Sequence, residues 1–337
     1  MTDRWDVIVV GSGAGGAAAA YKLVKAGKRV LMIEKGCRLP RDRTTLSTNI
    51  VFKEGRFANK TEWQDGHGKA FVPNGEHYNL GGKTKWYGAA LLRFSAAEFE
   101  ADPDFQCLAW PFGLDELEPY YAEAERMLHV NRFPNEPELQ SVIDNILDSD
   151  PSWRVEPLPL GLKPEIVNDP DEAKHFDGYA SVAGYKGDAE QSFIIPIENE
   201  PNFTLVLDKE VSGFLHENEK PELVRGVICA DGSYFWGKAV VLACGAMTSP
   251  RILEDYFAVT GLDHELPVRR RSAAISACTS TARWSSSRAF ATKTCCARPP
   301  SSTTTNIRTR PCSASVGWTA RSWRRNCPRP RRSSSPT

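Results

Sequence analysis

Residues 6–16 read Asp6-Val7-Ile8-Val9-Val10-Gly11-Ser12-Gly13-Ala14-Gly15-Gly16, and this stretch decides the fold. The apolar run that ends at Val10 predicts a buried parallel strand, and the small residues after Gly13 predict a helix that lies close to the sheet. Residues 29–33 predict a second strand, which is followed by Glu34. A G-x-G-x-x-G pattern between strand and helix, with an acid about 20 residues further on, predicts a dinucleotide-binding βαβ unit.

Each residue of this fingerprint has a mechanical task. Gly11 permits the tight turn, Gly13 lets the backbone approach a pyrophosphate at the helix N-terminus, and Gly16 permits close helix packing. Glu34 is expected to accept hydrogen bonds from ribose hydroxyls and to disfavour a 2′-phosphate. The fingerprint alone leaves FAD and NAD open as cofactors. The cofactor-binding residues predicted in this unit are Gly11, Ser12, Gly13, Ala14, Gly15, Gly16, Glu34 and Lys35.

The chain beyond residue 36 alternates between long loops and clearly patterned segments. Residues 37–78 are polar and loop-like, and loops of this length in a compact domain usually cover a ligand. Residues 115–128 predict an amphipathic helix capped by Asp115. Further predictions are a β-meander formed by residues 203–207, 211–216 and 224–230, a buried strand at 239–243, and a helix from Ser249 with Pro250 at its first position.

Three downstream segments carry a family resemblance. These are Gly81-Gly82 with Thr84 and Gly88, then Trp110-Pro111 followed by residues 117–125, and finally Gly245-Ala246 with Ser249-Pro250. In this order, over residues 4 to about 255, the chain resembles the glucose-methanol-choline family of flavoprotein oxidoreductases.

The resemblance implies FAD as the cofactor. It implies that Gly81, Gly82, Thr84 and Gly88 lie along the pyrophosphate and the isoalloxazine ring, and that backbone near Val211 and Gly245 closes the adenine side. Two departures concern the flavin ring: Lys83 stands where relatives place Ser or Thr, and Tyr256-Phe257 replaces Ser-Gly. The flavin loop contains no His, which gives no support to a covalent flavin link.

The reaction that the resemblance implies is oxidation of a CH–OH group in an alcohol or sugar-like substrate, with hydride passing to flavin N5. In the family a His near the carboxyl end takes the hydroxyl proton. The six histidines of this chain, at positions 67, 77, 129, 175, 216 and 264, lie in unlike contexts. The catalytic residue is therefore unassigned, although His67 and His77 flank the flavin loop, and we expect little turnover. The electron acceptor stays open between oxygen, a quinone and a cytochrome.

The charge distribution separates the end of the chain from the rest. Residues 1–267 carry 27 Lys and Arg against 42 Asp and Glu, whereas residues 268–337 carry 15 basic residues, no acid, and 24 Ser or Thr. Such a segment predicts a disordered tail. Its abrupt onset suggests translation in a shifted reading frame. The alternative is a genuine basic arm that binds the phosphates of a nucleic acid. We favour the shifted reading frame over this arm, so nucleic acid is not the expected partner.

These observations predict an α/β protein with a Rossmann-like FAD-binding domain, a partial α+β substrate domain and a disordered C-terminal tail. The expected boundaries are 1–95 and 191–257 for the FAD domain, 96–190 for the substrate region and 258–337 for the tail. No apolar run is long enough for a membrane helix and no secretory signal precedes the first strand, so a cytoplasmic location is expected. Nine cysteines without C-x-x-C spacing predict neither a disulfide framework nor a metal site. Two rivals remain: an NAD-dependent dehydrogenase on the same βαβ unit, and a non-catalytic chain with a nucleic-acid-binding tail.

Overall fold

The computed structural model of the chain describes residues 5–64, 68–73, 75–103, 107–217 and 220–262. The predicted tail, apart from residues 258–262, lies outside these residues. The described residues form two compact units. The first consists of residues 5–131 and 160–262, and the second consists of residues 132–159. The domain boundaries expected at residues 95 and 190 remain predictions.

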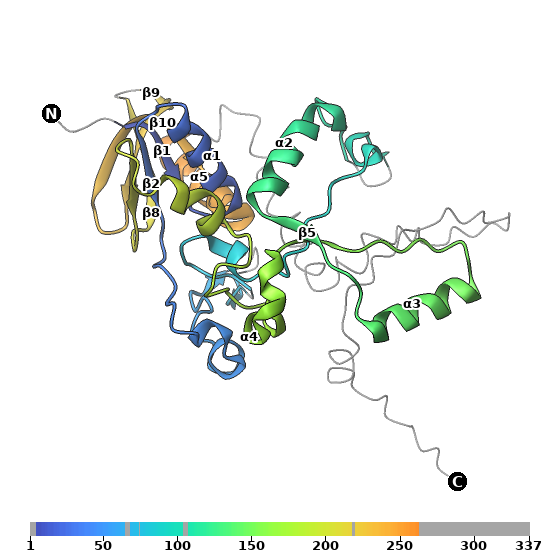
Figure 1. Cartoon of the computed structure of the whole chain (residues 1–337). Coiled ribbons are helices and arrows are strands. Elements are labelled where there is room, and N and C mark those ends of the chain that lie inside the picture. Colours follow the sequence, from blue (N-terminus) through green and yellow to red (C-terminus); the bar gives the residue numbers. More distant parts are fainter. Residues whose placement is uncertain (1–4, 65–67, 74, 104–106, 218–219, 263–337) are drawn as a thin grey trace, which may run out of the picture. The chain divides into compact units, whose positions relative to one another are not determined.

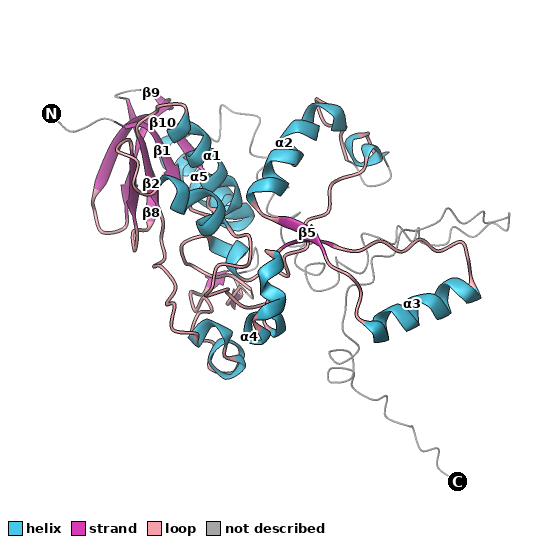
Figure 2. Cartoon of the chain, viewed as in Figure 1, coloured by secondary structure: helices cyan, strands magenta, loops and turns pink. Residues whose placement is uncertain are grey.

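The helices and strands are labelled in Figure 1 and coloured by type in Figure 2. The α-helices are α1 Ala14–Lys25, α2 Leu114–Met127, α3 Pro137–Ser149, α4 Pro170–Lys174 and α5 Gly245–Thr260. The short helical turns are η1 Thr44–Leu46, η2 Asn49–Lys53, η3 Gly82–Lys85, η4 Ala96–Phe99, η6 Pro164–Asn168, η7 Glu190–Ile194 and η8 Ile195–Ile197. The strands are β1 Trp5–Val10, β2 Val30–Ile33, β3 Trp63–Gln64, β4 Ala70–Phe71, β5 Val130–Arg132, β6 Pro159–Gly161, β7 Phe203–Val206, β8 Val211–Glu217, β9 Lys220–Cys229 and β10 Tyr234–Leu242.

A six-stranded sheet in the order β7-β2-β1-β10-β9-β8 forms the framework of the first unit. Strands β7, β2, β1 and β10 run parallel, and β10, β9 and β8 form an antiparallel meander. Strand β10 belongs to both parts, because Trp236 and its predecessors pair with β9 while Gly237 and its successors pair with β1. The predicted βαβ unit and α/β class are confirmed.

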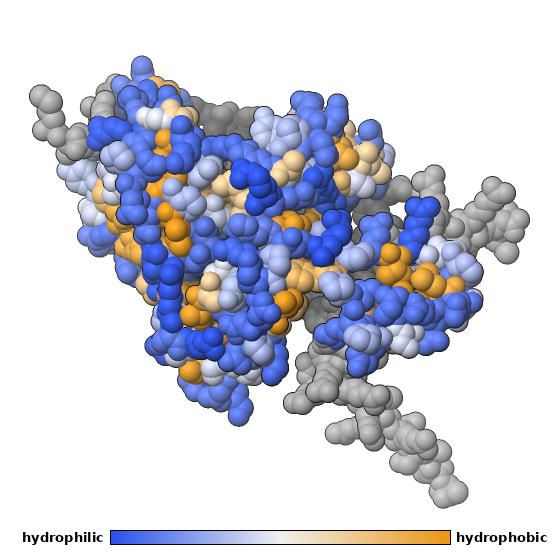
Figure 3. Space-filling model, in the orientation of Figure 1, coloured by the Kyte–Doolittle hydropathy of each residue, from blue (hydrophilic) through white to orange (hydrophobic). Residues whose placement is uncertain are grey.

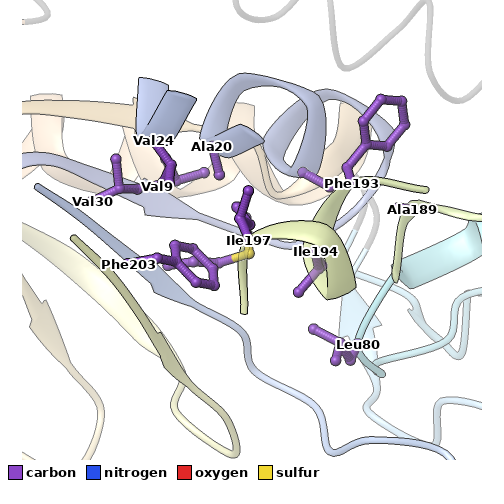
Figure 4. Close-up of a cluster of buried hydrophobic side chains, with 12 residues drawn as sticks. Val9, Ala20, Val24, Val30, Leu80, Ala189, Phe193, Ile194, Ile197 and Phe203 are labelled. Carbon is purple, nitrogen blue, oxygen red and sulfur yellow. The ribbon is translucent and has the colours of Figure 1, made fainter. Parts of the chain in front are cut away.

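Alternation along the parallel strands divides the core between the two faces of the sheet. Val9, Val30 and Met32 face α1, η7 and η8, as Figure 4 shows for Val9 and Val30. Ile8 and Leu31 lie on the opposite face, where residues of β8 and β9 cover them. Because successive side chains of a strand point to opposite sides, one short apolar run supplies both cores.

The structure corrects the predicted meander. Strand β7 is not part of it: β7 pairs in parallel with β2 at the edge of the sheet. The side-chain amide of Asn202 donates to the carbonyls of Val24 and Lys28, both at 2.9 Å, and Val30 N donates to the Asn202 carbonyl at 2.8 Å. These bonds fix the start of β7 beside β2, and the third strand of the meander is β10.

Two predicted helices begin elsewhere than expected. Helix α5 begins at Gly245, so Pro250 lies inside it; Ser249 Oγ accepts a hydrogen bond from the N–H of the N-cap residue Cys244 at 3.1 Å. The N-cap of α2 is Gly113, and Asp115 lies in the first turn. The expected apolar stripe of α2 exists in the sequence, but no residue of this helix is buried.

The surface view shows one face of the described chain. On the face that Figure 3 shows, hydrophilic residues predominate and apolar residues form separate areas. Among the helices of the described residues, none has both the length and the apolar character needed to cross a membrane.

Candidate cofactor site

A cavity of about 460 Å³ opens in the first unit where the parallel strands end. Strands β1, β2 and β10 all finish at this edge, at Val10, Ile33 and Leu242. In open α/β sheets, ligands bind outside the carboxyl ends of the strands. The cavity is lined by residues 10–15, 33–35, 76–78, 82–84, 209–211, 243–248 and 252.

The glycine-rich segment 11–16, which forms the turn after β1 and the start of α1, accepts no side chain at two positions. Gly11 has a φ of +96°, and a Cβ there would lie 2.5 Å from the Ala243 carbonyl oxygen. A Cβ on Gly16 would lie 2.0 Å from the Gly11 carbonyl oxygen. A Cβ on Gly13 or Gly15 would meet no atom within 4 Å, and both residues line the cavity.

The N-terminus of α1 therefore faces open space. The N-cap residue Gly13 offers no side chain to the helix, so the N–H groups of the first turn have no partner within the helix. These donors, together with the positive end of the helix dipole, favour an anionic ligand. A pyrophosphate matches this end of the cavity.

Glu34 lies at the end of β2 with only 7% of its surface exposed. One carboxylate oxygen accepts hydrogen bonds from Ser12 N at 3.0 Å and Ser12 Oγ at 2.5 Å, and the other accepts one from Gly36 N at 2.9 Å. A carboxylate accepts about four hydrogen bonds. One acceptor position is therefore left for a ligand hydroxyl.

The same serine joins the glycine turn to the second glycine segment. Ser12 Oγ accepts a hydrogen bond from Gly81 N at 3.0 Å while donating to Glu34. Thr84 Oγ1 then donates to the Gly81 carbonyl at 2.6 Å and accepts from Ala189 N at 2.9 Å. Hydrogen bonds thus join the glycine turn after β1 to the segment that contains Gly81 and Thr84.

Residues 6–302 match the family model described as DAO, FAD dependent oxidoreductase. The chain belongs to this family of FAD-dependent oxidoreductases. The family decides for FAD over NAD, which the fingerprint alone leaves open.

Two curated relatives confirm the resemblance to the glucose-methanol-choline oxidoreductases. A paromamine 6′-oxidase of Streptomyces fradiae is 30% identical over 284 residues, which cover 74% of this chain and 49% of the relative. A 6‴-hydroxyparomomycin C oxidase of Streptomyces lividus is 29% identical over 285 residues, with coverage of 74% and 50%. The chain spans about half the length of the curated relatives it matches.

A solved structure, pyridoxine 4-oxidase from Mesorbium loti, is 17% identical with a TM-score of 0.49. That match covers 74% of this chain and 51% of the other.

The residues present fit FAD. Gly13 and Gly15 leave open space beside the cavity, where a Cβ would otherwise lie. The N-terminus of α1 supplies donors for the pyrophosphate. Glu34 retains one acceptor position for a ribose hydroxyl. Val211 and Gly245 line the same cavity. Bound FAD would supply a ring that accepts a hydride, and the residues that line the cavity would bind and orient it.

Not every predicted residue reaches the cavity. Gly16, Gly81 and Gly88 do not line it. Gly16 permits the approach of α1 to the glycine turn, and Gly81 donates to Ser12. A Cβ on Gly88 would lie 2.8 Å from a carboxylate oxygen of Asp177, so this glycine serves packing in the described structure. The remaining predicted residues all lie along the cavity.

Several residues that line the cavity are not among the predicted cofactor-binding residues, and those with charged or phenolic side chains include Glu76, Tyr78, Lys83 and Glu210. Lys83, noted in the sequence as a departure from the family, forms an ion pair with Glu76. Proximity to the Gly81-Gly82 pair is the only pattern that could have indicated the first three, and nothing marks Glu210.

His77 lines the cavity, whereas His67 lies outside the described residues. His77 Nδ1 lies 2.8 Å from the Phe57 carbonyl, and the ring stacks on Trp86 with a centroid distance of 4.6 Å. Because a carbonyl only accepts, Nδ1 carries the proton. Burial lowers the pKa of His77, so the ring is neutral at neutral pH and Nε2 holds the lone pair.

A buried ion cluster lies beneath the second glycine segment. Lys85 Nζ lies 3.0 Å from Asp188 Oδ2 and 2.5 Å from Glu190 Oε2, and these side chains are at most 4% exposed. Arg38 also pairs with Glu190, at 2.9 Å. Buried charges of this kind must be paired, so the cluster holds the end of η3 against the start of η7.

Proposed function

We propose that this protein oxidises a CH–OH group of an alcohol or sugar-like substrate with FAD as the hydride acceptor. The observation that carries the proposal is the FAD site built on the βαβ unit, in a chain that matches the FAD-dependent oxidoreductases over residues 6–302. The two curated relatives, named as oxidases of paromamine and of 6‴-hydroxyparomomycin C, support an amino-sugar alcohol as the substrate class. A cytoplasmic location is part of the same proposal.

The chemistry requires hydride from the carbinol carbon to pass to flavin N5 and the hydroxyl proton to pass to a base, which leaves a carbonyl. Within the described residues, His77 is the one histidine that lines the cavity. It lies beside the flavin loop in the sequence, not at the carboxyl end where the family places its base. We therefore propose that this chain turns over little.

The test is anaerobic incubation of the FAD-loaded protein with paromamine, with its 6′-deoxy analogue and with a primary amine that lacks hydroxyls. Slow bleaching of the flavin absorbance by paromamine alone is expected. Bleaching by the amine that lacks hydroxyls would overturn oxidation at CH–OH, whereas bleaching by the deoxy analogue would assign the reaction to another carbinol of the sugar. Fast bleaching by paromamine would overturn the proposal of low activity but leave the reaction class intact.

The rival of a basic-tail binding protein rests on residues 268–337, which lie outside the described residues. No observation on the described chain favours it.

A further inference from the structure

Three side chains from three separate segments meet at one end of the cavity. Lys35 follows β2, Tyr78 precedes the Gly81-Gly82 pair, and Glu210 precedes β8. Lys35 Nζ lies 4.3 Å from the centre of the Tyr78 ring and 2.8 Å from Glu210 Oε1. All three residues line the cavity.

This bridge lies at the end where the adenosine half of FAD belongs. Lys35 directly follows Glu34, the residue with an acceptor left for a ribose hydroxyl. The Glu34 carbonyl accepts a hydrogen bond from Lys209 N at 3.0 Å, which fastens the turn before Glu210 to the end of β2. Val211, the next residue, lines the cavity.

The chemistry of the three groups favours a lasting contact. Burial raises the pKa of Tyr78 above its usual value of 10, so its ring is a neutral phenol that attracts a cation to its face. Glu210 supplies the counter-charge on the other side of Lys35. A cation held between an aromatic face and a carboxylate therefore links all three segments through one side chain.

We propose that Lys35 is a positioning residue that holds the walls of the adenosine pocket together through Tyr78 and Glu210. A wall held in place before binding loses less freedom when the cofactor enters, which strengthens affinity. The inference rests on FAD as the cofactor and is independent of the proposed oxidation of CH–OH groups.

The test measures the affinity of the full chain for FAD and for ADP, which carries the adenosine half without the flavin. Lys35→Ala should weaken both by the same factor, about 5- to 20-fold, from the loss of one cation–π contact and one exposed ion pair. Lys35→Arg and Tyr78→Phe keep the cation and the ring, and should retain the affinity. Tyr78→Leu should lose part of it.

The matched control is Lys25→Ala, which removes a surface ion pair of 2.6 Å with Glu200 away from the cavity. It should leave both affinities unchanged, and the urea midpoints of the ligand-free Lys25 and Lys35 variants should agree. An unchanged ADP affinity in Lys35→Ala, or an equal loss in the Lys25 variant, would overturn the proposal. The wild-type affinity for FAD is measured first, so failure of the cofactor assignment appears separately.

Discussion

Replacing Gly16 by alanine tests the close approach of α1 to the glycine turn. The added Cβ would lie 2.0 Å from the Gly11 carbonyl oxygen, whereas real Cβ contacts essentially never fall below 3.0 Å. The obstructing atom belongs to the backbone and cannot rotate away. Helix α1 must therefore move by roughly 1 Å or more.

That displacement has a cost in the core. Ala17, Ala20 and Val24 of α1 are at most 4% exposed, and the latter two appear in the cluster of Figure 4. Overpacking of this kind costs about 1–3 kcal/mol, and a backbone obstruction places the cost near 3 kcal/mol.

The matched control is Gly15→Ala, one residue earlier in the same helix, where a Cβ meets no atom within 4 Å. Both variants gain a similar helix propensity, up to about 1 kcal/mol, so the difference between them isolates the clash. Urea unfolding of the ligand-free proteins, followed by circular dichroism, should place the Gly16 variant about 1 M below the Gly15 variant. Equal midpoints would refute the reasoning.

Further variants test single contacts. Ser12→Ala leaves the Gly81 N–H without its acceptor and should lower the free energy of unfolding by about 1–3 kcal/mol in the same urea assay. Lys85→Met leaves two buried carboxylates without their shared cation and should cost about 3–5 kcal/mol, while Lys22→Met at an exposed pair should cost less than about 1 kcal/mol. The folded-state pKa of His77 lies below 6.5, so the unfolded chain binds the proton first and stability falls as the pH drops through 6.5. His77→Phe should reduce that loss; an unchanged pH dependence of the urea midpoint would contradict it.

Local sequence rules predicted the βαβ unit because its determinants lie close together. The strand ending at Val10, the glycines between β1 and α1 and the acid after β2 are each specified by neighbours in the chain. Gly11 is a clear case, since its φ of +96° lies in a region that residues with a side chain rarely adopt. Such a requirement is visible in the sequence as the fingerprint itself.

The position of β7 depends on distant residues, and the sequence pattern failed there. Phe203–Val206 has the same apolar character as a meander strand, and only the bonds from Asn202 to Val24 and Lys28 show that it joins the parallel edge. The cavity residues Tyr78 and Glu210 were missed for a similar reason. They come from irregular segments that local periodicity does not place.

The buried ion cluster shows a different limit. Lys85, Asp188 and Glu190 carry the charges that a pattern assigns to the surface, because isolated charges are almost never buried. They can be buried here because Lys85 pairs with both carboxylates, which lie more than 100 residues away from it in the sequence. Pairing at that separation leaves no local trace.

Ser12 joins two segments that the sequence predicted separately, the glycine fingerprint and the second glycine segment. Its place in the fingerprint was predicted, and so was the second glycine segment, but the two were independent predictions. The hydroxyl has a single proton, which it donates to Glu34, so only a lone pair is left for the Gly81 N–H. The carboxylate expected to bind the ribose and the predicted flavin loop therefore share one hydrogen-bonding side chain, so a displacement of one should displace the other. The candidate cofactor site is accordingly one hydrogen-bonded structure, which we expect to extend along both halves of FAD.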